Sequence, residues 1–520
     1  MLSRKELLLG LAAAPLAGHA RAAQAEINPR WLISEEEATA WHRAKDQNGP
    51  ALTGTESWRR FMAFLEAQLG ALGCVDIHRS PWTFTRRFSS MWPDASNWSL
   101  VSNGRAISLA NYAANCGLTG ASGVTAQLVL WDDERPPDVA GKIVVYRPQP
   151  RADVRGPFAD SDYERMTPFD SWPEEGRPAP QAQNATHSIA APVWDEMTAS
   201  SNFIAAMRER APAGVLFAFN LNRAAAAGLY TFRVPTHYDF PAAYLDRVNG
   251  QALVADARAG AWATLRVEGR EEQAEAYQLI AYLPGDAYGT PRDEQIHLRT
   301  HTDGPSISQD NGALGLLALI GYMACVRDRS RTLMLEFDCR HFMPGAETAW
   351  AHEDYFVKHP NVYERVRALI AMEHLGQIDY VEDGEDIRPS GRSLPTWIYA
   401  SANDAMIEAA YEAARANNVR SAIIRSPGRV GANGASQGPW YGMSRYGALR
   451  GLPSFGMQGD LGAYWAHSAG IERFDARAFV RQIAAFCQLT GFLMRADLAA
   501  LRPAPVDFPQ PTAFSWRVSH

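Results

Sequence analysis

The first part of the chain changes from a helical to an extended pattern of hydrophobic positions. Between residues 55 and 73, large apolar side chains recur every three or four positions, which predicts a helix with one buried face: Trp58, Phe61, Phe64, Leu65, Leu69 and Leu72. Gly73 interrupts this pattern and is expected to end the helix. The segment that follows, CVDIHRSPWTF, alternates between hydrophobic and polar residues and therefore predicts a strand.

The middle of the chain, from about residue 95 to residue 270, has a different pattern. Short runs of strand-forming residues are separated by turns, and they predict short strands in AQLVLW, GKIVVYR, AGVLFAF, FPAAYL and ATLRVEG. Residues 150–190 interrupt these runs with a stretch rich in Pro, Asp, Arg and Gly that has no apolar period. We expect this stretch to form a long surface loop or flap.

The last part of the chain alternates strands with helices. Strands are predicted in AYQLIAYLPG, QIHLRTHTDG, TLMLEFDC, SAIIRS and LPSFGM. Helices are predicted in NGALGLLALIGYMACV, NDAMIEAAYEAARANN and FDARAFVRQIAAFCQLTGFLM, and RVRALIAMEHLG is expected to pass from helix to strand. Apolar strands that alternate with helices predict an α/β fold, with a mainly parallel mixed sheet and helices on both faces.

The amino-terminal segment has the pattern of an export signal. Arg4 and Lys5 precede an apolar run over residues 7–17, and small residues follow over 20–25. The run is shorter than the roughly 20 apolar residues that a transmembrane helix needs. We therefore expect an exported protein, periplasmic or secreted, whose mature chain begins near Glu26. An ordinary amphipathic helix is the alternative, and the choice between Sec and twin-arginine export stays open.

Composition narrows the class of protein. Hydrophobic residues make up 47% and charged residues 21% of the 520 residues, as in globular proteins. The net charge of −7 argues against a nucleic-acid-binding protein. The five cysteines are far apart and form no C-x-x-C motif, which argues against a zinc ribbon or a disulfide scaffold. We expect them to be small buried residues, with no disulfide required for folding.

Side chains that can bind metal follow four of the predicted strands. They are His301 and Asp303, with Asp310 at the start of the next helix, then His341, which follows Arg340, then Glu373 and His374, and last His467. In open α/β sheets, ligands bind at the carboxyl ends of the strands, so we expect these residues to converge there. Nitrogen and oxygen donors together suit zinc or a similar divalent ion.

Two other motifs match catalytic patterns by their letters only. His297 and His301 have the spacing of a helical zinc pair, but in a strand their side chains would stand about 13 Å apart, at about 3.3 Å per residue. His297 is therefore expected to be a packed strand residue. Residues 434–438, GASQG, match the nucleophile elbow of serine hydrolases, but the sequence on both sides indicates a loop rather than a strand and a helix.

The order of the strand-end motifs resembles metallopeptidase family 28. The motifs are H-T-D, D-N-G-A-L-G, a strand-end pair, M-E-H-L-G and a late A-H-S, and the similarity covers about residues 50–95 and 271–495. The family includes two-zinc aminopeptidases, glutamate carboxypeptidase and glutaminyl cyclase. The resemblance implies a zinc-exopeptidase-like core. The β-rich middle segment looks like the protease-associated domain that many members insert, and PTHYDFPAAYLDRVNGQAL is similar to its closing segment.

This resemblance implies a division of the chain into five parts. They are an export signal at 1–25, the N-terminal part of the catalytic domain at 26–95, a β-rich insert similar to a protease-associated domain at 96–270, the metal-binding catalytic core at 271–500, and a Pro-rich tail at 501–520 that is expected to lie extended on the surface.

The resemblance also implies roles for individual residues. His301 matches the first histidine ligand, and Asp303 matches the aspartate that orients it. Asp310 matches the aspartate that bridges two ions. Glu373 stands where the family usually has an aspartate ligand of the first ion, and His467 matches the last histidine, a ligand of the second ion.

The sequence departs from the family at Arg340-His341, where the family typically has two glutamates, a general base and then a ligand. His341 can still bind zinc, because imidazole is a common donor. Arg340 cannot accept a proton, but its guanidinium could bind a substrate carboxylate or stabilise an oxyanion. The identity of the base stays open, and the nearest carboxylates in the sequence are Glu336, Asp338 and Glu347.

These observations favour an exported, metal-dependent hydrolase of the metallo-aminopeptidase type. It would cleave an amide bond of a peptide or an N-acyl amino acid with metal-activated water, using one or two zinc ions. A non-catalytic binding protein on the same scaffold is the alternative, because the usual base is missing, and a serine hydrolase is a third hypothesis. The expected partner is a peptide or small amide, with no nucleic acid and no transmembrane segment, and the oligomeric state stays open.

Overall fold

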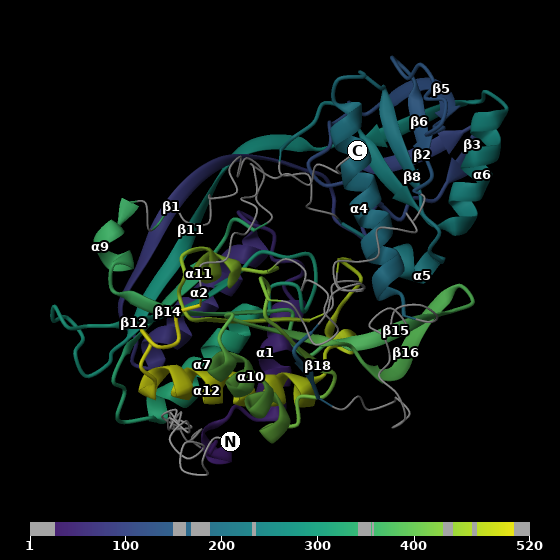
Figure 1. Cartoon of the computed structure of the whole chain (residues 1–520). Helices are drawn as coiled ribbons and strands as arrows, with labels where there is room; N and C mark the ends of the chain where they lie inside the picture. The colour runs from purple at the N-terminus through teal and green to yellow at the C-terminus, as the bar shows by residue number, and fades with distance from the viewer. Residues whose placement is uncertain are drawn as a thin grey trace, which may run out of the picture.

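Two β-sheets organise the chain. The computed structural model describes residues 26–148, 163–167, 188–230, 236–341, 355, 358–429, 440–459 and 465–503. One sheet has nine strands and the other has eight. The long strands β1 (Val75–Phe88) and β11 (Arg270–Leu283) pair along their length, and Figure 1 shows them running from the nine-stranded main sheet towards the second sheet.

Parallel pairing is concentrated in the centre of the main sheet. The strand order is β1, β11, β13 (Thr332–Asp338), β12 (Gln295–His301), β14 (Val366–Glu373), β19 (Ser454–Gly459), β17 (Thr396–Ala400), β18 (Ala422–Arg425) and β7 (Arg165–Met166). The adjacent strands β13, β12, β14 and β19 are parallel, whereas β11 and β17 pair antiparallel to the outer members of this group. The predicted mixed α/β fold is confirmed. The central arrangement brings the carboxyl ends of β12, β13 and β14 to one edge.

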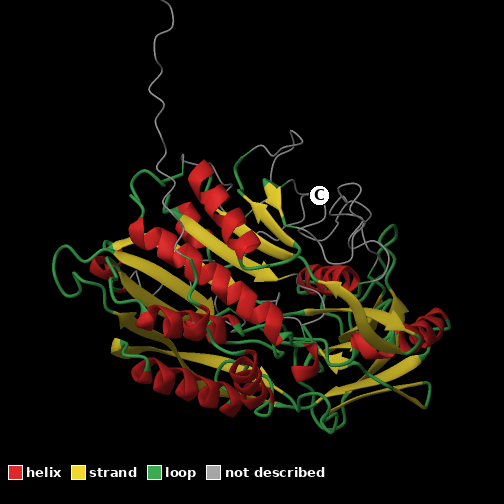
Figure 2. Cartoon of the chain, turned by 90° about the horizontal axis from the view of Figure 1, so that it is seen from below, coloured by secondary structure: helices red, strands yellow, loops and turns green. Residues whose placement is uncertain are grey.

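Long helices cover one face of the main sheet, and Figure 2 shows them lying along the strands. They are α1 (Glu35–Asp46), α2 (Glu56–Ala71), α7 (Gly312–Cys325), α10 (Asp404–Ala416) and α12 (Ala476–Arg495). Their apolar side chains share one core with alternate strand residues such as Leu298, Leu335 and Ile370. The other face carries the short helices α9 (Pro360–Tyr363) and α11 (Arg445–Leu449), whose neighbours include Met334 and Leu369.

Local sequence explains two of these helices. The predicted helix is α2, in which Thr55 caps the first turn by accepting a hydrogen bond from the backbone N–H of Trp58. Helix α7 is apolar around nearly its whole circumference, as expected of a helix buried on all sides. Its first residue, Gly312, allows this close packing, because a Cβ there would lie 2.1 Å from the carbonyl oxygen of Met372.

The second sheet lies within residues 98–267 and has its own hydrophobic core. Its order is β3 (Arg105–Ile107), β2 (Trp98–Ser102), β10 (Trp262–Val267), β5 (Val124–Leu130), β6 (Ile143–Tyr146), β8 (Gly214–Ala218), β9 (Ala242–Leu245) and β4 (Asn111–Tyr112). Helices α4 (Ala190–Met207), α5 (Arg223–Ala226) and α6 (Arg247–Arg258) belong to the same part of the chain. The five predicted short strands are present. The assignment of this segment to a protease-associated domain, and the domain limits, stay predictions.

Smaller elements complete the described fold. A separate pair of antiparallel strands, β15 (Ile378–Asp383) and β16 (Asp386–Ser393), follows the central strand β14. Single 3₁₀ turns lie at Pro29–Trp31 and Ile471–Arg473. None of the described helices is long and apolar enough to cross a bilayer.

Two expectations from the sequence are wrong. The RVRAL segment does not begin as a helix: Val366 opens strand β14, and the short helix α9 ends before it. Periodicity alone does not separate a buried strand from a helix over so few residues, and the position between β12 and β19 decides the outcome. Cys325 is exposed because it is the last residue of α7, whereas the other four cysteines are buried. All five are free thiols.

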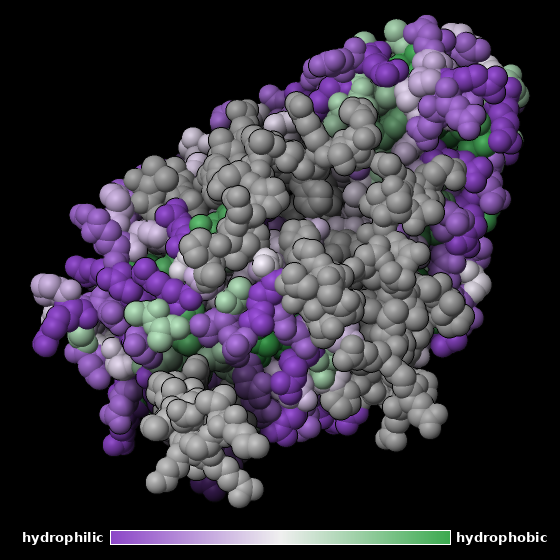
Figure 3. Space-filling view, viewed as in Figure 1, coloured by the Kyte–Doolittle hydropathy of each residue, from purple (hydrophilic) through white to green (hydrophobic). Residues whose placement is uncertain are grey.

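Several expectations lie outside the described residues. They concern the export signal at 1–25, most of the loop at 150–190, the GASQG motif at 434–438, Glu347, and the tail from residue 504 onward. In the face shown in Figure 3, the described surface is mostly hydrophilic and its hydrophobic residues are scattered.

A buried carboxyl group in helix α4 provides a test of the packing around the second sheet. Glu196, in α4, is 2% exposed, and its Oε1 accepts a hydrogen bond of 2.9 Å from the backbone N–H of Asn220. Burial raises the pKa of Glu196 to about 8, although the Asn220 hydrogen bond opposes this shift. The folded protein therefore holds this proton at pH values where the unfolded chain, with a glutamate pKa of about 4.3, has released it.

We predict that the contribution of Glu196 to the free energy of unfolding falls as the pH rises from about 4.5 to about 8, because the folded state keeps the Glu196 proton in this window. Glu196→Gln cannot ionise, so it should melt several degrees above the parent at pH 8.5 and close to the parent at pH 5. Melting temperatures measured across this range test the prediction. The exposed Glu209→Gln is the control. A difference that does not change with pH would contradict the assignment.

Candidate metal centre

Three of the predicted ligands meet at the carboxyl edge of the main sheet. His301 ends β12, Glu373 ends β14, and His341 follows the end of β13. One ligand atom from each residue forms a group in which all atoms lie within 4.8 Å of one another. Nε2 of His301 lies 3.8 Å from Oε2 of Glu373, and the rings of His301 and His341 stack with centroids 4.2 Å apart.

Strand register explains why His301 and Glu373 meet. Arg299 of β12 is the ladder partner of Ala371 of β14. A step of two residues along each strand keeps the same face, so it leads to His301 and Glu373 side by side. Both lie on the face opposite the Leu298 and Ile370 side chains of the main core.

The Glu373 carboxylate has one engaged oxygen and one open oxygen. Its Oε1 accepts a hydrogen bond of 2.5 Å from the backbone N–H of Met443, whereas Oε2 has no hydrogen-bond partner in the described part of the chain. The side chain is 2% exposed, and this burial raises the pKa of Glu373 to about 7 against the lowering effect of the Met443 N–H. A buried carboxylate oxygen without a donor is a site that a cation would stabilise.

A glycine allows the loop before Met443 to approach Glu373. Gly442 has a φ of +78°, a conformation that favours glycine, and a Cβ there would lie 2.6 Å from Oε1 of Glu373. A larger residue at this position would strain the loop and push the Glu373 carboxylate aside. Gly442 and Met443 could not be identified from the sequence, because nothing in it indicates which loop crosses the end of β14.

His301 is oriented by the backbone of Asp303. Nδ1 of His301 lies 3.0 Å from the carbonyl oxygen of Asp303, and a proton on Nδ1 would leave Nε2, the nitrogen that faces Glu373, with its lone pair available to a metal ion. The Asp303 carboxylate lies further away, at 3.8 Å from Nδ1, and accepts a hydrogen bond of 3.1 Å from the hydroxyl of Thr53. Asp303 therefore lies where an orienting residue is expected, with its carbonyl closer to His301 than its carboxylate.

Asp310 is paired with a cation of the protein. Its Oδ1 lies 2.6 Å from Nζ of Lys45, and both side chains are buried. Lys45 also donates a hydrogen bond of 2.9 Å to the carbonyl oxygen of Ser306. Burial raises the pKa of Asp310 to about 6, and Lys45 opposes this shift. Asp310 is not part of the three-residue group.

His467 also lies outside that group. Its ring packs against Tyr230 with centroids 4.7 Å apart, and its backbone N–H donates a hydrogen bond of 2.7 Å to the carbonyl oxygen of Gly228. Burial lowers the pKa of His467 to about 3. Three of the five predicted ligands thus come together. The ligand roles of Asp310 and His467 stay predictions.

Arg340 is a buried guanidinium with open donors. It is 1% exposed, its Nε lies 3.3 Å from Oδ1 of Asp338, and its guanidinium carbon lies 3.9 Å from the centroid of the Trp82 ring. Nη1 and Nη2 have no hydrogen-bond partner among the described residues. Two buried N–H₂ groups without acceptors would suit a carboxylate or an oxyanion.

Glu336 and Asp338, two of the carboxylates considered as the base, belong to a buried ion-pair network. Arg299 lies 3.4 Å from Oε1 of Glu336 and 3.7 Å from Oδ2 of Asp338. The other oxygen of Glu336 lies 2.9 Å from Nε2 of His297, which confirms that His297 is a packed strand residue. These engaged carboxylates are poor candidates for taking a proton from water.

The three-residue group fits one zinc ion. Zinc binds nitrogen and oxygen donors at about 2.0–2.2 Å in a tetrahedral arrangement, so its ligand atoms lie about 3.4 Å apart. The 3.8 Å between His301 and Glu373 is close to this separation. Three protein ligands would leave one position for water or substrate, which is the arrangement of catalytic zinc sites.

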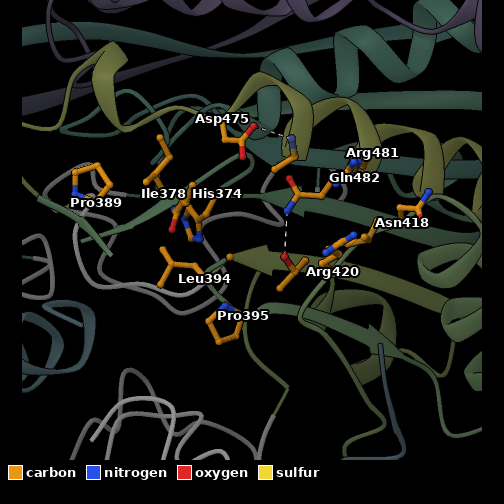
Figure 4. Close-up of a pocket in the computed structure, with 15 residues that line it drawn as sticks. His374, Ile378, Pro389, Leu394, Pro395, Asn418, Arg420, Asp475, Arg481 and Gln482 are labelled. Carbon is orange, nitrogen blue, oxygen red and sulfur yellow. Dashed lines mark hydrogen bonds between the residues drawn. The ribbon is translucent and has the colours of Figure 1, made fainter. Parts of the chain in front are cut away.

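A cavity lies next to the end of β14, although none of the three ligands lines it. It has a volume of about 310 Å³ and is lined by His374, which follows Glu373 directly. Figure 4 shows His374 and Leu394 on one side of the cavity, with Arg420 and Arg481 on the opposite side. Gln482 and Thr396 also line the cavity, and the Gln482 side chain donates a hydrogen bond of 3.1 Å to the Thr396 hydroxyl. The size is at the lower end of the range for small-molecule sites.

Comparison with solved structures finds the same fold in several bacterial proteins. An aminopeptidase from Aneurinibacillus sp. strain AM-1 is 14% identical, with a TM-score of 0.52, covering 92% of this chain and 97% of that chain. A zinc aminopeptidase from Bacillus subtilis is 12% identical, with a TM-score of 0.56, covering 92% and 99%. A peptidase M28 precursor from Shewanella amazonensis is 14% identical, with a TM-score of 0.58, covering 91% and 98%.

At these identities the likeness shows the fold. The predicted zinc-exopeptidase-like fold is therefore confirmed, and the likeness extends over nearly the whole length of the solved structures. Comparison of the sequence with protein-family models and with curated proteins finds no match.

We predict that Gly442→Ala weakens zinc binding by at least tenfold, because its methyl group would displace the Glu373 carboxylate. Gly451→Ala is the matched control, since Gly451 also has a positive φ, of +65°, but has open space around it. Both variants should lose about 1 kcal/mol of stability through backbone strain. Zinc titration with a competing chelator measures the affinity. Equal affinities for both variants would contradict the proposed position of Glu373.

Proposed function

We propose that this protein is an exported, metal-dependent hydrolase that cleaves an amide bond of a peptide or an N-acyl amino acid. The observation that carries the proposal is the group formed by His301, His341 and Glu373, whose donor atoms lie within 4.8 Å of one another. The fold shared with zinc aminopeptidases supports the same function. Export rests on the sequence of residues 1–25 alone.

In this proposal the chain's own residues supply orientation and charge. A zinc ion held by the three residues would supply Lewis-acid activation of a carbonyl group and of water. The Asp303 carbonyl fixes the ring of His301, and the Met443 N–H fixes Glu373 by holding its other oxygen. Because both ligands are fixed by the backbone, the site is preorganised for its ion.

Arg340 is the proposed anion-binding residue. Arg340 directly precedes the ligand His341 in the chain. Asp338, the ion-pair partner of Arg340, is also the ladder partner of His301 between β12 and β13. The two N–H₂ groups of Arg340, which have no acceptor in the described part of the chain, would bind a substrate carboxylate or the negative charge that develops on a carbonyl oxygen during amide cleavage. An acidic group near the cleaved bond is therefore expected to improve the substrate.

We expect the purified mature protein to contain zinc and to lose amide hydrolysis when a chelator removes it, with recovery when zinc returns. Metal analysis and a panel of aminoacyl and N-acyl amides test this expectation. His301→Ala, His341→Ala and Glu373→Ala should each lower bound zinc at least tenfold. His78→Ala, which changes an exposed histidine far from the group in sequence, is the control.

Two other outcomes have clear meanings. Zinc binding without hydrolysis of any substrate would favour a binding protein on the same scaffold. Hydrolysis that is indifferent to chelators but blocked by an active-site phosphonate would favour a serine hydrolase.

We predict that Arg340→Lys lowers kcat/KM on acidic substrates by about ten- to a hundredfold and on matched neutral substrates much less. Lysine keeps the positive charge but loses the planar pair of donors. A hydrogen bond to a charged group contributes roughly 1.5–3 kcal/mol, so its loss would weaken transition-state binding by about that amount. Zinc content should stay unchanged in this variant. If Arg340 instead marks a site that lacks only its base, Arg340→Glu would raise hydrolysis and Arg340→Lys would have no effect.

A further inference from the structure

Lys45 is a buried lysine paired with Asp310, one of the predicted metal ligands. It lies in the last turn of α1, and its side chain is 3% exposed. Nζ lies 2.6 Å from Oδ1 of Asp310 and donates a hydrogen bond to the carbonyl oxygen of Ser306. The third side of the ammonium faces the ring of Phe61, whose centroid is 5.6 Å away. The ammonium group is thus surrounded by partners that favour a positive charge.

The Asp310–Lys45 contact leaves little room for a metal ion at the same oxygen. An ion bound to Oδ1 would lie about 2.0–2.2 Å from it, close to the place that Nζ occupies at 2.6 Å. A divalent ion there would also be repelled by the ammonium at short range. The other oxygen, Oδ2, has no hydrogen-bond partner among the described residues, but an ion bound there would still be repelled by the Lys45 ammonium on the same carboxylate.

We propose that the centre holds a single divalent ion, bound by His301, His341 and Glu373, and that the Lys45 ammonium compensates Asp310 in place of a second ion. This inference rests on the proposed function, because it presupposes the metal site at the three residues. It assigns Lys45 as a positioning residue: its charge allows Asp310 to stay buried and ionised without a metal.

Metal stoichiometry in the full-length protein is the first test. The parent, loaded with excess zinc and then dialysed, should contain one zinc per chain. Asp310→Asn should keep that zinc, with an affinity within about threefold of the parent, because Asp310 does not bind the ion. Two ions per chain, or loss of zinc in Asp310→Asn, would overturn the inference and leave the proposed hydrolase in place. A parent that binds no zinc would overturn both.

The second test measures the Lys45–Asp310 pair without reference to activity. Lys45→Met should lower the melting temperature, because it leaves a buried carboxylate without its cation. Adding Asp310→Asn should recover most of that loss. Arg43→Met, which changes an exposed cation of the same helix, is the control and should melt close to the parent. If Asp310→Asn brought no recovery, Lys45 would not be the compensating charge. If Lys45→Met does not fold, the zinc content of the parent and of Asp310→Asn decides.

Discussion

Charge buried at the carboxyl edge of the main sheet is the constraint on which the rest of the centre depends. Ionised groups removed from water are stable only when opposite charges or hydrogen bonds compensate them. The network of Arg299 with Glu336 and Asp338 and the pair of Lys45 with Asp310 meet this requirement inside the protein. The first network joins strands β12 and β13, and the second pair joins α1 to Asp310. The side chains engaged in these contacts are not free to act on a substrate.

Several groups of the site have a buried polar atom without a hydrogen-bond partner in the described part of the chain, and two of them bear directly on the proposed chemistry. Glu373 presents Oε2 without a donor, and Arg340 presents Nη1 and Nη2 without an acceptor. The first would be stabilised by a cation and the second by an anion. A metal ion would satisfy Glu373 and an anionic substrate group would satisfy Arg340. The proposed function therefore gives Glu373 a role in metal binding and Arg340 a role in substrate binding. Arg340 stands where the family has its general base, so in this chain the position would bind an anion instead of accepting a proton.

Much of the fold followed from the sequence, because its strands and helices have strong periodic patterns. His301 and Glu373 could be predicted as neighbours, since residues that end adjacent parallel strands meet by geometry. The short RVRAL segment could not be assigned correctly, because its few apolar residues fit a helix and a strand equally. The exposure of Cys325 depends on its place at the very end of α7, which the pattern does not define to one residue.

The contacts of Asp310 with Lys45 and of Glu373 with the loop at Gly442 and Met443 could not be predicted. Lys45 lies on the same helix face as the buried Ala38 and His42, but nothing in the sequence indicates that its partner is Asp310. Likewise, Gly442 and Met443 reach Glu373 through a loop whose path depends on the packing of the whole sheet edge. Both features join segments that are distant along the chain, so only the three-dimensional structure could identify them.

Anomalous diffraction at the zinc absorption edge, from crystals of the zinc-loaded protein, tests the central claim most directly. The account predicts one peak, about 2.0–2.2 Å from the ring nitrogens of His301 and His341 and from Oε2 of Glu373, with Lys45 still paired to Asp310. Absence of a peak at these three residues, or a peak bound to Asp310 in place of Lys45, would contradict it.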